Sequence, residues 1–152
     1  MTTILHVSDL HFGPHYHPVV GAALLEFAPA AAPDVIVASG DFTHRAKPEQ
    51  FAAAREFLDC LPPVPLLCVP GNHDVPLYRV FERLLTPHAL YERFISPDRD
   101  SVIEIPGLVM VGLDSTAPYT AVTNGRISRG QLSFTSRAFE RASADAIRVV
   151  VA

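Results

Sequence analysis

Residues 35–45 have the sequence VIVASGDFTHR, an apolar and largely β-branched run that stops abruptly at Gly40 and Asp41. Such a run predicts a buried strand, because β-branched side chains pack well on a pleated surface. Gly40 lets the backbone turn sharply, so we expect the Asp41 carboxylate to point out of the end of the sheet. A Gly-Asp pair after one strand is weak evidence of a site by itself.

Two similar strand ends flank this stretch in the sequence. Residues 4–8 (ILHVS) lead into Asp9-Leu10-His11, and residues 65–69 (PLLCV) lead into Pro70-Gly71-Asn72-His73-Asp74. In open α/β sheets, ligands bind beyond the carboxyl ends of the strands. The sequence therefore predicts that one edge of the sheet gathers Asp9, His11, Asp41 and Asn72.

The segments between these strands predict helices. Apolar residues from Val20 to Phe27 recur at helical spacing (Val20, Ala23, Leu24, Phe27), and Pro29 and Pro33 are expected to close this helix. A second helix is predicted to begin at Pro48 and to line one face with Phe51, Ala54, Leu58 and Leu61. The order strand, helix, strand, helix, strand implies a parallel sheet with right-handed crossovers.

The second half of the chain predicts further strands and helices. Residues 77–85 and 90–95 are expected to be helical, and residues 102–105 and 108–113 to form a hairpin through Pro106-Gly107. A hairpin among parallel strands makes the sheet mixed. Ser128-Arg129-Gly130-Gln131 has the form of a capping box at the start of a helix. Residues 147–151 predict another buried strand.

Composition and charge limit the class of protein. The 152 residues predict one domain, 1–152, and 49% hydrophobic with 18% charged residues is typical of a globular chain. A net charge of −4 without a basic run argues against binding nucleic-acid phosphates. Cys60 and Cys68 are expected to be core thiols in a reducing compartment. The sequence shows neither a basic-then-apolar leader nor an apolar run near the ~20 residues that span a bilayer. We therefore expect a cytoplasmic protein that does not enter membranes.

The residue types at the three strand ends indicate metal chemistry. Carboxylate, imidazole and amide donors suit divalent Mn, Fe or Zn better than a thiolate site would. Asp41 has two oxygens and can bridge two cations, which could hold a hydroxide between them and clamp a phosphoryl group. Each motif alone would more often be an ordinary surface pair or turn. Their occurrence at three successive strand ends is improbable by chance.

Taken in order, Asp9-x-His11, Gly40-Asp41 and Gly71-Asn72-His73-Asp74 resemble the first blocks of the calcineurin-like metallophosphoesterases. The runs Ser8-Asp9-Leu10-His11-Phe12-Gly13 and Gly40-Asp41-Phe42-Thr43-His44-Arg45 are similar to bacterial members near the cyclic-nucleotide phosphodiesterase branch. The resemblance covers essentially the whole chain. It implies a four-layer α/β/β/α sandwich and the hydrolysis of a phosphomonoester or phosphodiester by a metal-bridging hydroxide.

The resemblance also implies a role for each matching residue. Asp9 and His11 would bind the first metal ion, Asp41 would bridge both, and Asn72 would bind the second. His73 would contact the substrate phosphate and assist the leaving group, with Asp74 fixing the orientation of its ring. His44 lies close enough in sequence to be a candidate at the edge of the substrate. The implied partner is a small phosphorylated molecule such as a nucleotide.

The chain departs from the family at its C-terminal end. Family members supply one more metal-binding histidine after a strand and then a Gly-His-x-His block, which this sequence lacks. We therefore expect an N-terminal portion of the domain that holds one metal ion or none and shows little or no activity alone. Its final apolar strand would lack covering elements and form an exposed edge, so we expect the chain to be poorly behaved or self-associated. The other histidines are expected elsewhere: His6 packed or hydrogen-bonded in a strand, His88 on the surface, and His15-x-His17 in a loop.

Two alternatives belong to other classes. One is a non-catalytic remnant that binds a single metal weakly or only docks a partner, and metal content per chain would separate it from an enzyme. The other is a doubly wound nucleotide-binding module. It is disfavoured because the segment after the first strand offers only Gly13 and not a glycine-rich phosphate loop.

Overall fold

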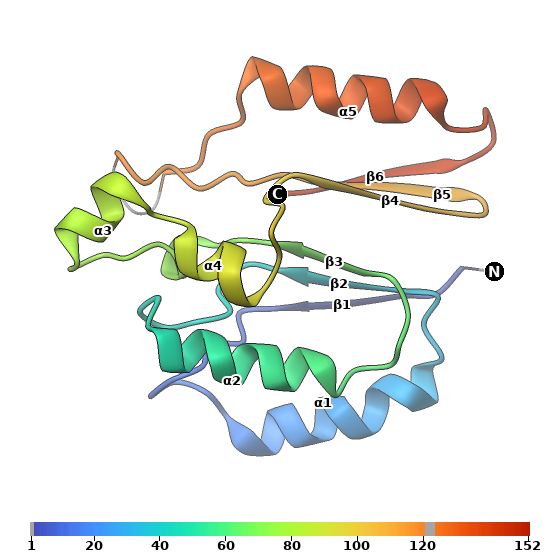
Figure 1. The fold of residues 1–152 in the computed structure, drawn as a ribbon. Helices are drawn as coiled ribbons and strands as arrows, with labels where there is room; N and C mark the ends of the chain where they lie inside the picture. The colour runs from blue at the N-terminus through green and yellow to red at the C-terminus, as the bar shows by residue number, and fades with distance from the viewer. Residues whose placement is uncertain (1, 121–123) are drawn as a thin grey trace.

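The structure is a computed structural model that describes residues 2–120 and 124–152. These residues form two stacked sheets with helices on the outer side of each sheet (Figure 1). The first sheet contains β1 (Ile4–Ser8), β2 (Val35–Ser39) and β3 (Leu66–Val69) in the order β1-β2-β3. All its pairings are parallel, with Ile4 opposite Val35 and Ile36 opposite Leu66. The predicted parallel arrangement of these strands is confirmed, so their carboxyl ends share one edge.

The second sheet is mixed. It contains β4 (Ser101–Ile105), β5 (Leu108–Gly112) and β6 (Ile147–Val151) in the order β4-β5-β6. β4 and β5 are antiparallel, and β5 and β6 are parallel. Gly107 in the turn between β4 and β5 has a φ of 79°, a conformation that glycine adopts without strain. The predicted hairpin through Pro106-Gly107 is therefore confirmed.

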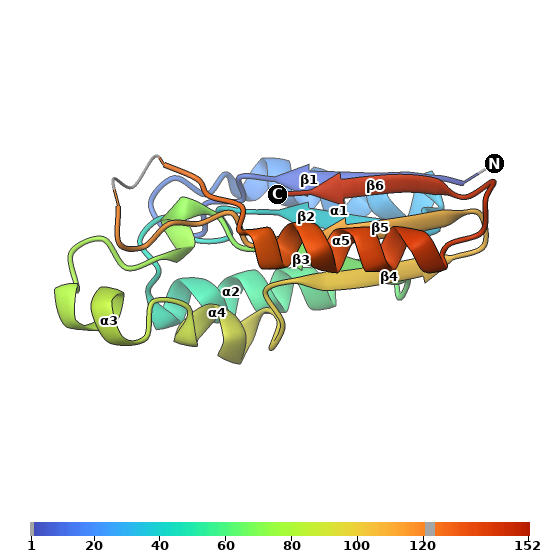
Figure 2. The same cartoon turned by 90° about the horizontal axis from the view of Figure 1, so that it is seen from above.

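Helices cover the outer face of each sheet and complete the predicted four-layer α/β/β/α sandwich (Figures 1 and 2). α1 (Pro18–Ala31) and α2 (Pro48–Asp59) cover the first sheet, and α5 (Arg129–Arg141) covers the second. The short elements η1 (Asn72–Asp74), α3 (Val80–Leu85) and α4 (Ala89–Phe94) lie in the connection from β3 to β4. Within the described part of the chain, no helix combines the length and apolar character needed to cross a bilayer.

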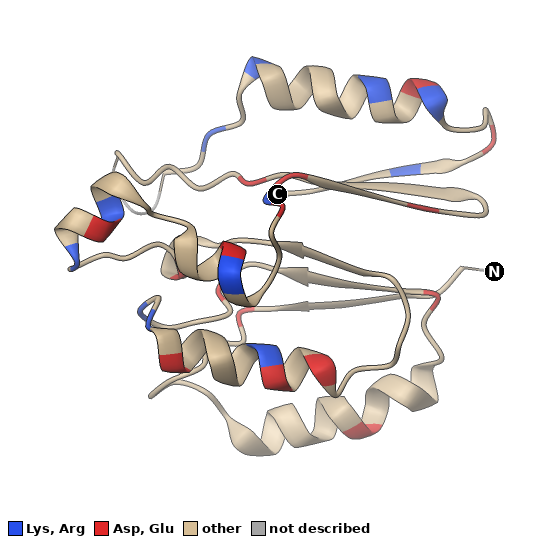
Figure 3. Cartoon of the chain, in the orientation of Figure 1, with Lys and Arg blue, Asp and Glu red and all other residues tan. Residues whose placement is uncertain are grey.

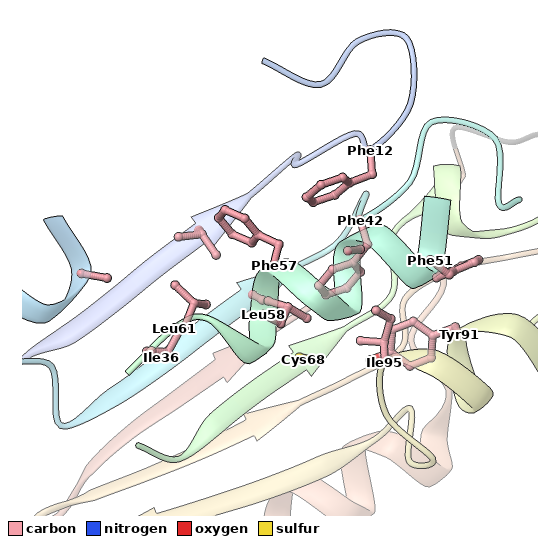
Figure 4. Packing of buried hydrophobic residues seen from close by; sticks show 14 of the residues in the cluster. Phe12, Ile36, Phe42, Phe51, Phe57, Leu58, Leu61, Cys68, Tyr91 and Ile95 are labelled. Atoms are coloured by element: carbon pink, nitrogen blue, oxygen red, sulfur yellow. The ribbon is translucent and has the colours of Figure 1, made fainter. Parts of the chain in front are cut away.

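The central strand β2 faces two different cores. Its alternate residues Ile36 and Ala38 join the core under α1 and α2, which Figure 4 shows with Phe42, Phe51 and Phe57. Val35 and Val37 point the other way and pack with residues of β3 and β5 between the sheets. Strands β1, β2 and β3 carry no Lys, Arg, Asp or Glu (Figure 3). Burial on both faces explains why this stretch is a continuous apolar run.

α2 matches its prediction and α1 differs from it. Phe51, Ala54 and Leu58 of α2 are buried. α1, however, continues through Pro29 to Ala31, and Val20 and Phe27 are 67% and 58% exposed. The buried positions of α1 are the small residues Gly21 and Ala28. Gly21 packs against Tyr16, since a Cβ there would overlap the Tyr16 hydroxyl, and two of the larger side chains of the helix face outward.

Residues 147–151 form a strand as predicted, and β6 is the exposed apolar edge that is expected where covering elements are lacking. β5 is its only partner in the described sheet, and Ile147 and Val150 are 62% and 50% exposed. The prediction for the cysteines needs correction in part. Cys68 is buried as predicted, and burial raises the pKa of its thiol to about 12. Cys60, in contrast, is exposed. It lies just beyond the last residue of α2 and is therefore not on the face of that helix that packs against the core.

Candidate functional site

The loops after β1, β2 and β3 stay hydrogen-bonded to one another beyond the ends of the strands. His11 N donates to Asp41 O at 2.9 Å, and Phe12 N donates to Phe42 O at 2.9 Å. Gly40 N donates to Val69 O at 2.9 Å, which ties the second loop to β3. The side chains that these loops carry are therefore held in a fixed register.

Three candidate metal ligands in these loops adopt left-handed backbone conformations. The φ angles are 56° at Asp9, 49° at His11 and 51° at Asp41. A non-glycine residue in this region costs roughly 1–3 kcal/mol and is maintained by its surroundings, most often at functional sites. The geometry turns the Asp9, His11 and Asp41 side chains toward one place at the edge of the sheet.

Asp9, His11 and Asp41 form a compact group of metal-type ligands. His11 Nε2 lies 3.7 Å from Asp9 Oδ1 and 3.7 Å from Asp41 Oδ2. These distances are too long for hydrogen bonds. Two donors that each lie about 2.1 Å from one ion are at most about 4.2 Å apart, so the separations fit a shared cation. One ligand atom from each residue lies within 4.8 Å of the others.

Asn72 borders the same space. Asp9, Asp41 and Asn72 line a pocket of about 250 Å³, and the second sheet contributes Ser115 and Thr116 to its wall. Gly71 allows the β3 loop to come this close, because a Cβ there would overlap Asp41 Oδ1. The structure thus brings together all the residues that the sequence proposes as metal ligands. The sequence did not propose Ser115 or Thr116 as part of the site. Their position just after the apolar run of β5, which ends near the same place, is the sequence feature that could have indicated it.

Asp41 has its two carboxylate oxygens in different environments. Oδ1 accepts a hydrogen bond from His73 N at 2.9 Å, while Oδ2 faces His11. The Asp41 side chain is only 14% exposed, compared with 65% for Asp9. Asp41 is therefore the less exposed carboxylate of the group and is fixed by a hydrogen bond, whereas the Asp9 carboxylate faces solvent.

The partner of the His73 ring differs from the prediction. The sequence predicts that Asp74 orients this ring, but His73 Nδ1 lies 2.9 Å from the carbonyl oxygen of His44. Asp74 instead accepts hydrogen bonds from the backbone N–H groups of Gly71, Phe42 and Thr43 at 2.9–3.2 Å. The cause is the 3-10 turn η1, which directs the Asp74 side chain back beneath the loops.

Asp74 is fully buried among these donors. Burial raises the pKa of its carboxyl to about 7, against the opposing effect of the backbone N–H groups of Gly71, Thr43 and Phe42. Thr43, with no exposed surface, also donates its hydroxyl toward Asp74 and toward the carbonyl of His73. Asp74 and Thr43 thus connect the loop after β2 to the loop after β3 through buried hydrogen bonds.

His44 lies among other histidines. Its ring centroid is 4.2 Å from that of His15, 5.5 Å from that of His73 and 6.2 Å from that of His11. Partial burial, followed by the positive charge of Arg45, lowers the pKa of His44. His6, as predicted, is hydrogen-bonded, at 2.6 Å from Ser39 Oγ.

His88 is buried and not on the surface as the sequence suggests. It is 6% exposed and lies 2.8 Å from Thr116 Oγ1 and 3.0 Å from an Arg99 guanidinium nitrogen. The same Arg99 nitrogen donates to Asp114 at 2.9 Å. These contacts come from segments distant in the sequence, and no local pattern marks them.

Comparisons with known proteins agree with this architecture. A family model described as calcineurin-like phosphoesterase matches residues 2–145. The glycerophosphodiester phosphodiesterase GpdQ of Enterobacter lignolyticus (strain SCF1) is 35% identical over 81 residues, which span 47% of this chain and 29% of that protein. The crystal structure of TT1561 of Thermus thermophilus has a TM-score of 0.56 at 16% identity, covers 97% of this chain and 65% of the other, and shows a shared fold.

Each of these two alignments spans less than two thirds of the other protein. The family model, by contrast, covers most of the present chain, including the ends of β1, β2 and β3 that carry the candidate metal ligands. The chain belongs to the calcineurin-like phosphoesterase family.

Proposed function

We propose that this site hydrolyses a small phosphoester with divalent metal ions held by Asp9, His11, Asp41 and Asn72. The family consists of metal-dependent phosphoesterases, which supports the reaction class. The observation that carries the proposal is the position of His11 Nε2, 3.7 Å from a carboxylate oxygen of both Asp9 and Asp41. His11 Nδ1 is buried without a hydrogen-bond partner among the described residues, so no hydrogen bond at that nitrogen directs the ring away from the two carboxylates.

Each residue has a distinct task in this proposal. Asp41 would lie between two ion positions, with Asp9 and His11 on one side and Asn72 on the other. When bound, divalent ions would supply Lewis acidity at the phosphoryl oxygens and lower the pKa of an attacking water. His73 would contact the phosphate and pass a proton to the leaving group through Nε2, because Nδ1 is engaged with the His44 carbonyl. Asp74 would act indirectly, by holding the loop that carries His73.

A phosphodiester is the substrate class that we favour. The support is the similarity to a protein named as a glycerophosphodiester phosphodiesterase. The pocket of about 250 Å³ has room for a small substrate or for the phosphate-bearing part of one. A phosphomonoester is the second candidate. A nucleotide as substrate, self-association of the chain, and Mn, Fe or Zn as the metal remain predictions.

The test compares a generic aryl phosphodiester with an aryl phosphomonoester, each with Mn²⁺ or Zn²⁺, for the wild type and Asp41→Asn. We expect metal-dependent turnover, faster on the diester, and loss of most metal occupancy and turnover in Asp41→Asn. Asp145→Asn makes the same chemical change at an exposed position before β6 and should leave both unchanged. Metal binding without any turnover would favour the non-catalytic alternative.

A further inference from the structure

His44 belongs to a group of imidazoles beside the carboxylates of the candidate metal site. One ring nitrogen each from His11, His44 and His73 lies within 4.8 Å of the others. The ring centroids of His11 and His73 are 4.9 Å apart. The three residues belong to the three loops that follow β1, β2 and β3. Three nitrogen donors from separate loops therefore converge on one space.

The ring of His73 is held in one tautomer. Its Nδ1 lies 2.9 Å from the His44 carbonyl, which can only accept, so Nδ1 carries the proton. Nε2 of the neutral ring then keeps its lone pair. A histidine that donates its other N–H to a backbone carbonyl is the usual arrangement of a metal-bound imidazole. The His44 backbone thus prepares His73 as a ligand while the His44 side chain adds another.

His11 is common to two different donor sets. With Asp9 and Asp41 it forms an oxygen-rich set, and with His44 and His73 it forms a nitrogen-only set. Carboxylates suit Mn²⁺, whereas imidazoles suit Zn²⁺, Cu²⁺ and Ni²⁺, with Cu²⁺ bound most tightly and Mn²⁺ most weakly. Three imidazoles are also a known ligand set for Zn²⁺. The two sets should therefore select different ions.

We propose that His11, His44 and His73 form a nitrogen-donor position for a transition-metal ion such as Cu²⁺ or Zn²⁺, separate from the oxygen-rich position at Asp9 and Asp41. The inference rests on the proposed function only in its description of the neighbouring position. An ion bound by His11, His44 and His73 engages the His73 imidazole, which the proposed function assigns to contact with the substrate phosphate. Such an ion competes with the phosphoester and does not assist its hydrolysis.

The test is a binding titration without substrate on the tag-free chain. Cu²⁺ binding is followed by electron paramagnetic resonance, in which bound imidazole nitrogens split the copper signal, and Mn²⁺ binding by loss of the free-ion signal. The variants are His44→Ala and, with a polar side chain kept in place, His44→Gln. His17→Ala removes an exposed histidine from the nearby loop and is the matched control. Circular dichroism verifies that each variant is folded.

We expect both His44 variants to weaken Cu²⁺ binding by about tenfold or more, since even residues that only orient metal ligands contribute that much. Mn²⁺ binding should change by less than about twofold on the same scale, and His17→Ala should change neither. Unaltered Cu²⁺ affinity in folded His44 variants would overturn the inference, as would an equal loss of both ions. Phosphodiester turnover is measured separately with Mn²⁺, so its absence would count against the proposed function and not against this position.

Discussion

At the scale of single residues, the site depends on backbone conformations that the sequence does not reveal. The spacing of Asp9, His11 and Asp41 predicts that they meet, and the structure places them together. Their positive φ angles were not predictable, because they are imposed by hydrogen bonds between loops such as His11 N to Asp41 O. Asp and His tolerate this region better than bulky residues do. The residue types are therefore suited to the conformation as well as to metal binding.

Gly71→Ala should damage the site by crowding. A Cβ at this position would overlap Asp41 Oδ1, and overpacking of this kind typically costs about 1–3 kcal/mol. We expect lower stability in denaturant and weaker Mn²⁺ binding. Gly130→Ala, at the start of α5, is the matched control, because the nearest atom to its Cβ would be 3.7 Å away. Equal behaviour of the two variants would show that the β3 loop can yield without cost.

His73→Ala should separate turnover from binding of the oxygen-rich ion. The side chain is a proton donor or acceptor in the proposed function, a role that typically contributes ~10²–10⁴-fold to the rate. Mn²⁺ affinity should be retained, because Asp9, His11 and Asp41 remain. Steady-state kinetics with Mn²⁺ and a parallel Mn²⁺ titration measure the two effects. If Mn²⁺ binding fell as far as turnover, His73 would be a ligand of that ion and its proposed role would be wrong.

At the scale of elements, Asp74 joins the loops that follow β2 and β3. Each of its oxygens accepts backbone N–H groups: Oδ1 from Thr43, and Oδ2 from Phe42 and Gly71. In Asp74→Asn, an amide NH₂ would replace one acceptor and leave buried donors unpaired. Such a loss costs about 1–3 kcal/mol. Urea denaturation should show this, with Asp145→Asn unchanged. A fully stable Asp74→Asn would mean that the loops are held by their backbone contacts alone.

Helices and strands were predictable from the sequence wherever apolar residues or turn residues formed a clear pattern. The apolar runs of β1, β2 and β3, the Pro48 start of α2 and the Pro-Gly hairpin are all confirmed. α1 was less predictable, because its periodic residues Val20 and Phe27 are exposed while the small residues Gly21 and Ala28 are buried. β6 has the composition of a buried strand but the position of an edge strand. Position in a sheet depends on neighbours, which local sequence does not specify.

At the scale of the whole molecule, the second sheet closes the site through a network around His88. Arg99 donates to Asp114, and Thr116 Oγ1 donates to Asp114 at 2.6 Å. His88 lies against both Arg99 and Thr116, and Thr116 lines the pocket that holds Asp9 and Asp41. The network joins the segment before α4 to the loops after α4 and β5. The sequence suggested a surface histidine because none of these partners is local.

His88 should make stability fall on the acid side. Burial, followed by Arg99, lowers the pKa of His88 below its ordinary value of 6.5, although Asp114 and Glu92 oppose the shift. Arg99 donates toward Nδ1, which keeps that nitrogen unprotonated in the folded state. The unfolded chain therefore takes up a proton at a higher pH than the folded chain does. The resulting stabilisation is complete above pH 6.5 and is lost as the pH falls through the folded pKa.

The measurement compares wild type and His88→Gln by urea denaturation at intervals from pH 8 to pH 5. The variant keeps a polar side chain in the network but cannot be protonated. The difference in unfolding free energy between the two chains cancels the other titrating groups, including Asp74, whose raised pKa acts in the opposite direction. We expect wild type to be the more stable chain near pH 8 and to lose that advantage toward pH 5. A difference that stays constant across this range would mean that His88 titrates alike in the folded and unfolded chains, despite its burial.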